Sequence, residues 1–187
     1  MFQVILNPIK AIERERKNRS TGKTIGKIIV GSLFLGVAAL IVAMVFTNNI
    51  GTSIIVGLGI TATGFIGNFV YAWIYNIAIN TLTGKGTYQD TLASLANSLL
   101  IIGTGLMLSM PLWLIPQAGV FLTMILLIIT LVLAYAVLIK SLMTFTGADL
   151  LSIIIGLGIV IFASLMAAYL IIAVITLQTS FLNSGLA

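Results

Sequence analysis

The stretch IIVGSLFLGVAALIVAMVF, residues 28–46, contains no charged residue and is long enough to cross a lipid bilayer as a helix. Hydrophobic residues make up 60% of the 187-residue chain and charged residues only 7%, whereas about a quarter of the residues in a soluble domain are charged. Further apolar stretches follow at about 54–82, 88–110, 118–143 and 149–178. The sequence therefore predicts an all-α integral membrane protein, a bundle of five transmembrane helices.

Positive charge is concentrated at the start of the chain. Seven of the nine Lys and Arg residues lie within residues 1–27, and the other two are Lys85 and Lys140. If the N-terminus is cytoplasmic, five spans place all nine on the cytoplasmic side, as the positive-inside rule requires. We therefore predict an N-in, C-out orientation, with residues 1–27 as a cytoplasmic basic segment and residues 28–187 as the transmembrane domain.

The N-terminal segment is interpreted as an amphipathic helix at the cytoplasmic membrane interface. Asn7-Pro8 is typical of a helix start, because Asn caps the helix and Pro suits its first position. Ile9 and Ile12 share one face, which would enter the lipid, while cations contact anionic headgroups. The cations expected to contact the membrane surface or a partner are Lys10, Arg14, Arg16, Lys17 and Arg19. The segment either anchors the first span and fixes its topology or docks a cytoplasmic partner.

Polar side chains recur along the second and third predicted spans. Because polar groups are costly in lipid, these faces should turn inward. They form either hydrogen bonds between helices or the lining of a polar path. The predicted polar stripe consists of Asn68, Asn76, Asn80, Ser94 and Asn97.

Pairs of small residues four positions apart predict where helix backbones approach closely. Such pairs replace bulky contacts with backbone packing in membrane helices. The predicted pairs are Ser32/Gly36, Thr63/Gly67 and Ala163/Ala167.

Two acidic residues are predicted to begin spans at the cytoplasmic end. Asp90 and Asp149 each follow a threonine by three residues, as in a capping box with Asp in place of Glu. The alternative is a cytoplasmic-facing site built from these two acids with Lys85 and Lys140. The predicted cytoplasmic-end motif consists of Gly84, Gly86, Thr87, Tyr88, Asp90 and Asp149.

The chain has few of the side chains that usually carry out catalysis. The chain has no Cys and no His, and only four acidic residues, so thiol, imidazole and soft-metal chemistry are excluded. No acid or base is predicted near the middle of a span, where a proton- or sodium-coupled transporter normally needs one. We therefore expect no enzymatic activity, no cofactor and no bound metal.

Two motifs resemble those of a known family. Asn7, Pro8 and Ala11 match a short NP-initiated motif, and GKGTYQDTLASLANSLL, residues 84–100, matches a segment that enters the third span. The chain thus resembles the prokaryotic branch of the Yip-domain family, five-span relatives of the Ypt/Rab-GTPase-interacting proteins. For eukaryotic members the resemblance implies vesicle trafficking and membrane shaping. The acidic segment associated with Rab GTPase contact is missing here, which argues against a Rab-type partner.

The sequence favours a non-enzymatic membrane scaffold or adaptor that organises the membrane or recruits protein partners at the cytoplasmic face. Two alternatives stay open: an accessory subunit of a larger membrane complex, and a small transporter or channel. The expected partners are the lipid bilayer, with anionic headgroups at the N-terminal segment, and other membrane proteins, but no nucleic acid. The expected location is a prokaryotic cytoplasmic (plasma) membrane.

Overall fold

A computed structural model describes residues 7–18, 20–115 and 118–184, and every element in these ranges is a helix. The elements are α2 (Pro8–Lys17), α3 (Thr21–Thr47), α4 (Ile50–Thr83), α5 (Tyr88–Ser109), the 3₁₀ helix η1 (Met110–Leu114), α6 (Ala118–Thr146) and α7 (Leu150–Ser184).

Four of the described helices, α3, α4, α5 extended by η1, and α6, are long and apolar enough to cross a membrane. The described apolar segment of α7, Leu150–Met166, is also apolar but is shorter than these four helices. The expectation of an all-α protein with membrane-spanning helices is therefore confirmed. The five-span count and the N-in, C-out orientation stay predictions.

Local sequence explains where most helices begin and end. The Asn7 side chain accepts a hydrogen bond from the Lys10 backbone amide and caps α2, as predicted. Asn48 (φ 48°) and Gly84 (φ 63°) end α3 and α4 in the left-handed conformation that commonly closes a helix. The first long helix begins at Thr21 rather than at Ile28, because no residue in TGKTIGK interrupts the helix.

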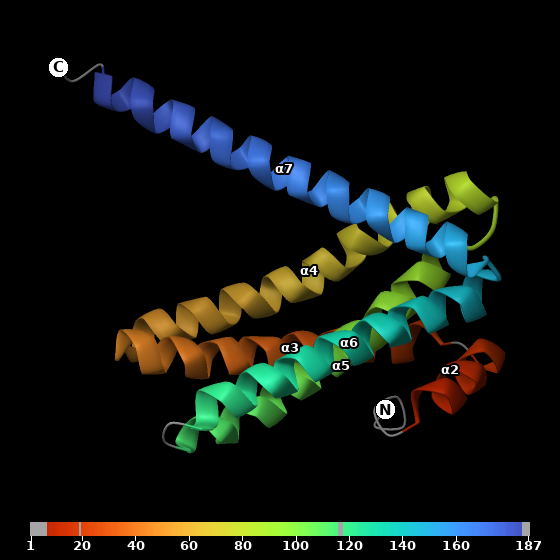
Figure 1. The fold of residues 1–187 in the computed structure, drawn as a ribbon, viewed down its shortest axis with the longest axis horizontal. Coiled ribbons are helices and arrows are strands. Elements are labelled where there is room, and N and C mark those ends of the chain that lie inside the picture. Colours follow the sequence, from red (N-terminus) through yellow and green to blue (C-terminus); the bar gives the residue numbers. More distant parts are fainter. Residues whose placement is uncertain (1–6, 19, 116–117, 185–187) are drawn as a thin grey trace.

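α5 is the central helix of the bundle. It packs against α3, α4 and α6, and α3 also packs against α4 (Figure 1). In the most apolar stretch of α5, 67% of the residues are buried inside the protein, against 11% for α4. Small and polar residues such as Ala93, Ala96 and Ser94 of α5 are therefore covered by neighbouring helices.

The close contact between α3 and α4 depends on small residues. Gly36 faces Gly57 and Thr61, and a Cβ on Gly36 would lie 2.7 Å from the Gly57 carbonyl oxygen. This confirms Gly36 as a packing position. The prediction for Thr63/Gly67 is wrong, because Thr63 is exposed and a Cβ on Gly67 would meet nothing within 4 Å.

The third predicted small-residue pair lies on α7. Ala163 is exposed, and the side chain of Ala167 lies outside the described residues. The prediction of close packing at this pair therefore stays a prediction.

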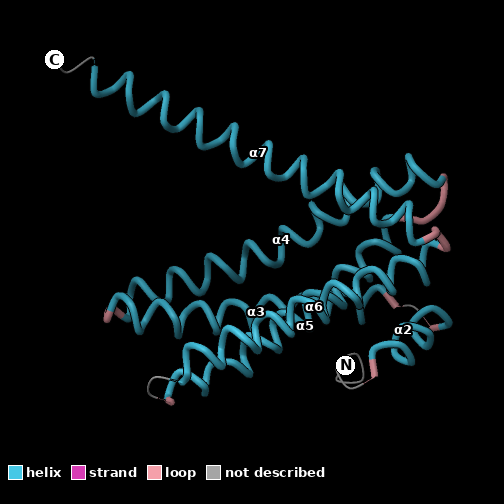
Figure 2. Tube along the Cα trace, viewed as in Figure 1, coloured by secondary structure: helices cyan, strands magenta, loops and turns pink. Residues whose placement is uncertain are grey.

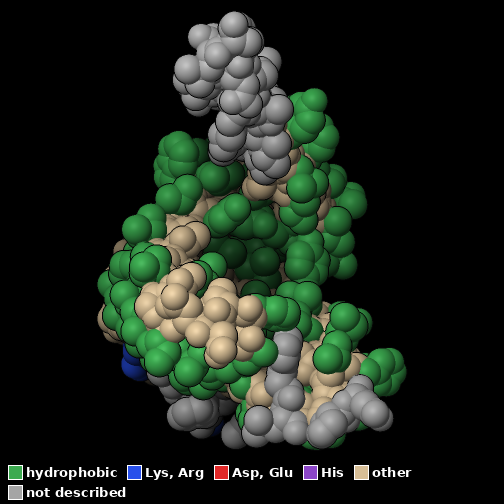
Figure 3. Space-filling view, turned by 90° about the vertical axis from the view of Figure 1, so that its left-hand side faces the viewer, with side chains coloured by type: hydrophobic (Ala, Val, Ile, Leu, Met, Phe, Trp, Pro, Cys, Tyr) green, Lys and Arg blue, Asp and Glu red, His purple; other side chains and the backbone are tan. Residues whose placement is uncertain are grey.

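α7 runs away from the rest of the bundle (Figure 1). The first part of α7 packs tightly, where Ile153, Leu157 and Val160 join a cluster with Tyr75 and Ile79 of α4 and with Leu138 and Leu142 of α6. Farther along, Phe162, Leu165 and Tyr169 are exposed. The divergence leaves a hollow lined by hydrophobic side chains on the face shown in Figure 3.

The connections between helices lie at the two ends of the bundle. Residues 84–87 and 147–149 lie at the end where α2 packs, and the α3–α4 connection lies at the opposite end (Figure 2). A Cβ on Gly86 (φ 94°) would lie 2.8 Å from Thr146 Cγ2, so the 84–87 connection passes close to the end of α6. Lys85 and the basic residues of α2 therefore lie at one end of the protein, the arrangement that the positive-inside rule uses to assign a cytoplasmic face.

Candidate functional site

α2 presents two different faces because of the spacing of its residues. Ile12 and Glu15 lie one turn apart on the face toward the bundle, whereas Lys10, Arg14 and Lys17 lie on the other side of the helix. Each face forms part of a polar or charged cluster. The inner face joins a buried network, and the outer face lines a basic cleft.

The apolar contact of α2 is with protein. Ile12 is 1% exposed and packs in a cluster with Leu100 and Ile101 of α5 and with Ala134 and Val137 of α6. Ile9 is 54% exposed. The prediction that Ile9 and Ile12 enter the lipid together is therefore wrong for Ile12. An isoleucine that reaches the groove between two long helices buries more area there than at a headgroup surface.

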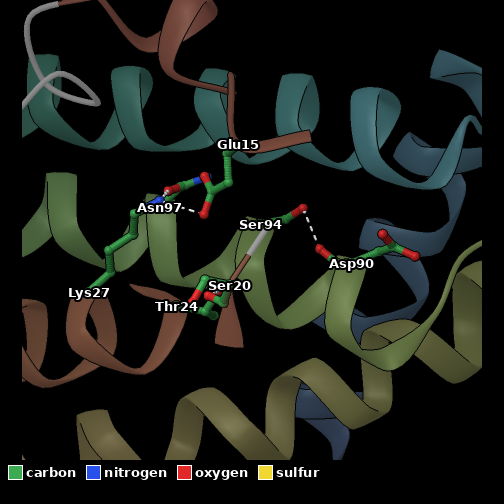
Figure 4. Close-up of polar contacts among 7 residues, drawn as sticks. All are labelled: Glu15, Ser20, Thr24, Lys27, Asp90, Ser94 and Asn97. Atoms are coloured by element: carbon green, nitrogen blue, oxygen red, sulfur yellow. Dashed lines mark hydrogen bonds and ion pairs between the residues drawn. The ribbon is translucent and has the colours of Figure 1, made fainter. Parts of the chain in front are cut away.

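Glu15, Lys27 and Asn97 form a closed network, called here the docking network (Figure 4). Lys27 Nζ lies 2.6 Å from Glu15 Oε1 and donates a hydrogen bond to Asn97 Oδ1 over 2.7 Å. Asn97 Nδ2 donates to Glu15 Oε2 over 3.0 Å. The three side chains come from α2, α3 and α5, so the network connects α2 to α3 and α5.

The docking network is largely buried. The side chains of Lys27 and Glu15 are each 9% exposed, and Asn97 is fully covered. Removing one partner of a buried ion pair leaves an uncompensated charge, which typically costs about 3–5 kcal/mol. The network therefore favours one position for α2, because a displaced α2 would lose the Glu15–Lys27 ion pair and the Asn97–Glu15 hydrogen bond.

Sequence reasoning found Asn97 as part of the polar stripe and missed Glu15 and Lys27. Asn97 bonds to side chains of two other helices, which confirms an inter-helix role for this residue. The sequence gives only a weak signal for its two partners. Lys27 lies at the edge of an apolar run and Glu15 lies in a basic segment, and charged residues in such places are usually exposed to water.

The structure does not bring the rest of the polar stripe together. Ser94 Oγ donates to the Asp90 carbonyl oxygen of its own helix over 2.9 Å. Asn68 is buried and its Oδ1 has no hydrogen-bond partner, Asn76 is half-buried, and Asn80 is exposed. None of these residues lines the cavity of about 970 Å³ between α2 and α6 or the cavity of about 330 Å³ between α4 and α7.

The residues of the cytoplasmic-end motif shape the connections between helices. Thr87 and Asp90 form the predicted capping box, with the Thr87 amide donating to Asp90 Oδ2 over 2.6 Å. Tyr88 donates from its hydroxyl to the Phe69 carbonyl oxygen of α4 over 3.3 Å. Gly84 and Gly86 adopt positive φ, which glycine tolerates at helix ends and tight turns.

The second predicted capping box is wrong in its register. Thr146 belongs to the end of α6, and Asp149 itself precedes α7. Asp149 Oδ2 accepts from the Ser152 amide over 3.1 Å, and Oδ1 accepts from the Ser152 hydroxyl over 2.7 Å. These two hydrogen bonds from Ser152 lower the pKa of the exposed Asp149 carboxyl.

A basic cleft lies between the outer face of α2 and the last turns of α6. Its cavity volume is about 970 Å³. The lining residues are Lys10, Glu13, Arg14, Arg16, Lys17, Lys140, Met143 and Thr144. Four of the five cations predicted to contact a surface or partner are thus brought together, and the fifth, Arg19, lies outside the described residues.

Lys140 is the residue of the cleft that sequence reasoning did not connect with the N-terminal segment. It is separated from α2 by most of the chain, and only the packing of α2 beside α6 brings the two together. The described residues show no group of three acidic side chains that could hold a metal ion. The described residues of the cleft instead include five cations and one carboxylate, an environment for an anionic ligand.

Comparison with known proteins identifies one family. The family model described as Yip1 domain matches residues 2–172, a range that includes α2, the docking network, the basic cleft and the first part of α7. Comparison with curated proteins and with solved structures gives no significant match.

Proposed function

Because the chain belongs to the Yip1 domain family, we propose that it is a non-enzymatic membrane scaffold that recruits protein partners at the membrane face where α2 lies. The family is not known as an enzyme family. The observation that carries the proposal is the docking network, which makes α2 a fixed part of the folded protein.

A docked helix suits partner recognition for a physical reason. Ordering a flexible segment on binding reduces affinity, whereas a surface held in place before binding avoids much of that cost. α2 is held from one side by Ile12 and Glu15, which leaves its other side available. Ile9 lies one turn before Ile12, is 54% exposed, and does not line the basic cleft. Ile9 is therefore the apolar residue that a partner would contact.

The test is mild extraction of the full-length chain from native membranes, followed by quantitative identification of the proteins that co-purify. An Ile9→Ser variant should lose a stoichiometric partner. The matched control is Ile50→Ser, because Ile50 is also exposed (63%) but lies at the opposite end of the bundle. Recovery of the same proteins with both variants, or of no protein with the unmodified chain, would contradict the proposal.

A second candidate function, an accessory subunit of a larger membrane complex, is favoured by α7. An apolar cavity of about 330 Å³ lies between α4 and α7, and its lining includes Ala163 and the 60% exposed Trp73. A photo-reactive residue placed at position 163 distinguishes the two candidates. Cross-links to another membrane protein support the accessory role, and cross-links to lipid alone argue against it.

A further inference from the structure

The basic cleft combines cations from two separate parts of the chain. Lys10, Arg14, Arg16 and Lys17 come from α2, and Lys140 comes from α6. Among the described residues of the lining, Glu13 is the single acidic one. The other glutamate of α2, Glu15, is held on the opposite face by Lys27 and Asn97, so it does not neutralise the cleft.

This charge and geometry suit phosphate groups. Arginine can bind two phosphate oxygens at once, and lysine supplies a compact charge. Ligand sites typically measure about 300–1,000 Å³, and the cleft measures about 970 Å³. With five cations and one carboxylate in the lining, a ligand with more than one negative charge fits better than a singly charged one.

The surface of α6 next to the cleft favours a lipid as the molecule that would supply such a phosphate group. Leu133 and Ile129 lie two and three turns from Lys140 on the same face of α6, and they are 49% and 50% exposed. The face of α6 that contributes Lys140 to the cleft is thus continued by an exposed apolar strip along a helix long enough to span a membrane. A headgroup in the cleft could place its acyl chains along this strip.

We infer that the basic cleft binds the headgroup of a membrane lipid that carries more than one phosphate charge. The site is pre-formed, because the docking network fixes α2 at its position beside α6. The inference goes beyond the scaffold proposal and needs no protein partner, so purified protein can test it and the two can fail separately.

The experiment measures lipid binding to the purified full-length chain in detergent by native mass spectrometry. The probes are cardiolipin, which carries two phosphates, and phosphatidylcholine, which has no net charge. We expect one cardiolipin to be retained and phosphatidylcholine to be displaced. Lys140→Gln should weaken cardiolipin binding about fivefold, which corresponds to the ~1 kcal/mol expected for one basic residue near an anionic lipid surface. Lys10→Gln should act in the same direction from the α2 side.

The matched control is Lys85→Gln. Lys85 is also an exposed lysine at the α2 end of the bundle, but it does not line the cleft. Both changes remove one positive charge, so a general electrostatic effect would lower binding equally. Equal losses for Lys140→Gln and Lys85→Gln would overturn the inference. So would equal retention of phosphatidylcholine by the unmodified chain.

A soluble probe separates a lipid site from a site for free phosphate compounds. Glycerol 3-phosphate carries a phosphate monoester but has no acyl chains to contact Leu133 and Ile129. We expect it to compete with cardiolipin only weakly. Competition at an affinity equal to that of cardiolipin would overturn the assignment to a lipid. Thermal unfolding of each variant checks that the exposed substitutions leave the fold intact.

Discussion

Asn97 shows how one buried side chain can join three helices. Its amide accepts a hydrogen bond from Lys27 and donates one to Glu15, so both ends of the side chain are satisfied. A polar residue at this depth would be costly if it were left unpaired. The three residues therefore stabilise the protein as a unit, and their contributions to stability should not be additive.

We predict this non-additivity for Lys27 and Glu15. Lys27→Met leaves the Glu15 carboxylate buried without a cation and should lower the free energy of unfolding by about 3–5 kcal/mol. Adding Glu15→Gln removes that charge, so the double variant should be more stable than Lys27→Met alone. Thermal unfolding in detergent measures the stability of the single and double variants. A double variant whose loss equals the sum of the two single losses would show that the residues act independently.

Gly36 is predicted to tolerate no side chain. In Gly36→Ala the new Cβ would lie 2.7 Å from the Gly57 carbonyl oxygen, so α3 and α4 must separate. Overpacking of this kind typically costs about 1–3 kcal/mol. The matched control is Gly67→Ala, because a Cβ there meets nothing within 4 Å and Ala favours a helix. Equal unfolding temperatures for the two variants would contradict the close contact.

At the scale of single elements, a short sequence pattern predicts the cap of a helix when the end of the preceding helix is also predicted correctly. Asn7-Pro8 and Thr87–Asp90 were predictable because all of their contacts lie within one turn. The Thr146–Asp149 pattern has the same spacing, but α6 extends to Thr146, so the threonine is not available as a cap. The pattern was insufficient there because two helices compete for the same residues.

The cap of α7 should depend on pH. Because hydrogen bonds from Ser152 lower the pKa of Asp149 in the folded state, the carboxylate stabilises the cap above its ordinary pKa of about 3.9. That contribution is lost as the pH falls through the lowered folded-state pKa. Exchange of the Ser152 amide hydrogen should therefore show increased opening below about pH 4. In an Asp149→Asn variant, which caps without a charge, the opening should show no such transition.

The position of α2 could not be predicted from the sequence. Ile9 and Ile12 are equally apolar, and helical spacing alone places both near one face. The difference in their exposure arises because α5 and α6 present a groove of Leu100, Ile101 and Val137 to Ile12 only. Contacts between residues so far apart in sequence depend on the tertiary arrangement, which short patterns do not contain.

At the scale of the whole molecule, the bundle places the basic residues at one end. The all-helical fold with membrane-spanning helices was predictable because long apolar runs are unambiguous. The departure of α7 from the bundle was not predictable, because its sequence is apolar on all sides and does not specify a packing partner.

The predicted N-in orientation is testable because the chain has no cysteine. In intact cells, a maleimide that does not cross membranes should label an Asn48→Cys variant and leave a Lys85→Cys variant unlabelled. Both residues lie in exposed connections at opposite ends of the bundle. After the membrane is permeabilised, both variants should react. The reverse pattern in intact cells would show that the basic end faces outward.

The docking of α2 on the bundle can be tested directly in the membrane. Ile9→Cys and Ile12→Cys variants are compared in permeabilised native membranes with a water-soluble maleimide. If α2 is docked, the cysteine at position 9 reacts and the one at position 12 is protected until the protein is unfolded. Reaction at both positions would indicate a free segment, and protection at both would indicate a helix buried in lipid. Either result would contradict the docked helix on which the proposed function depends.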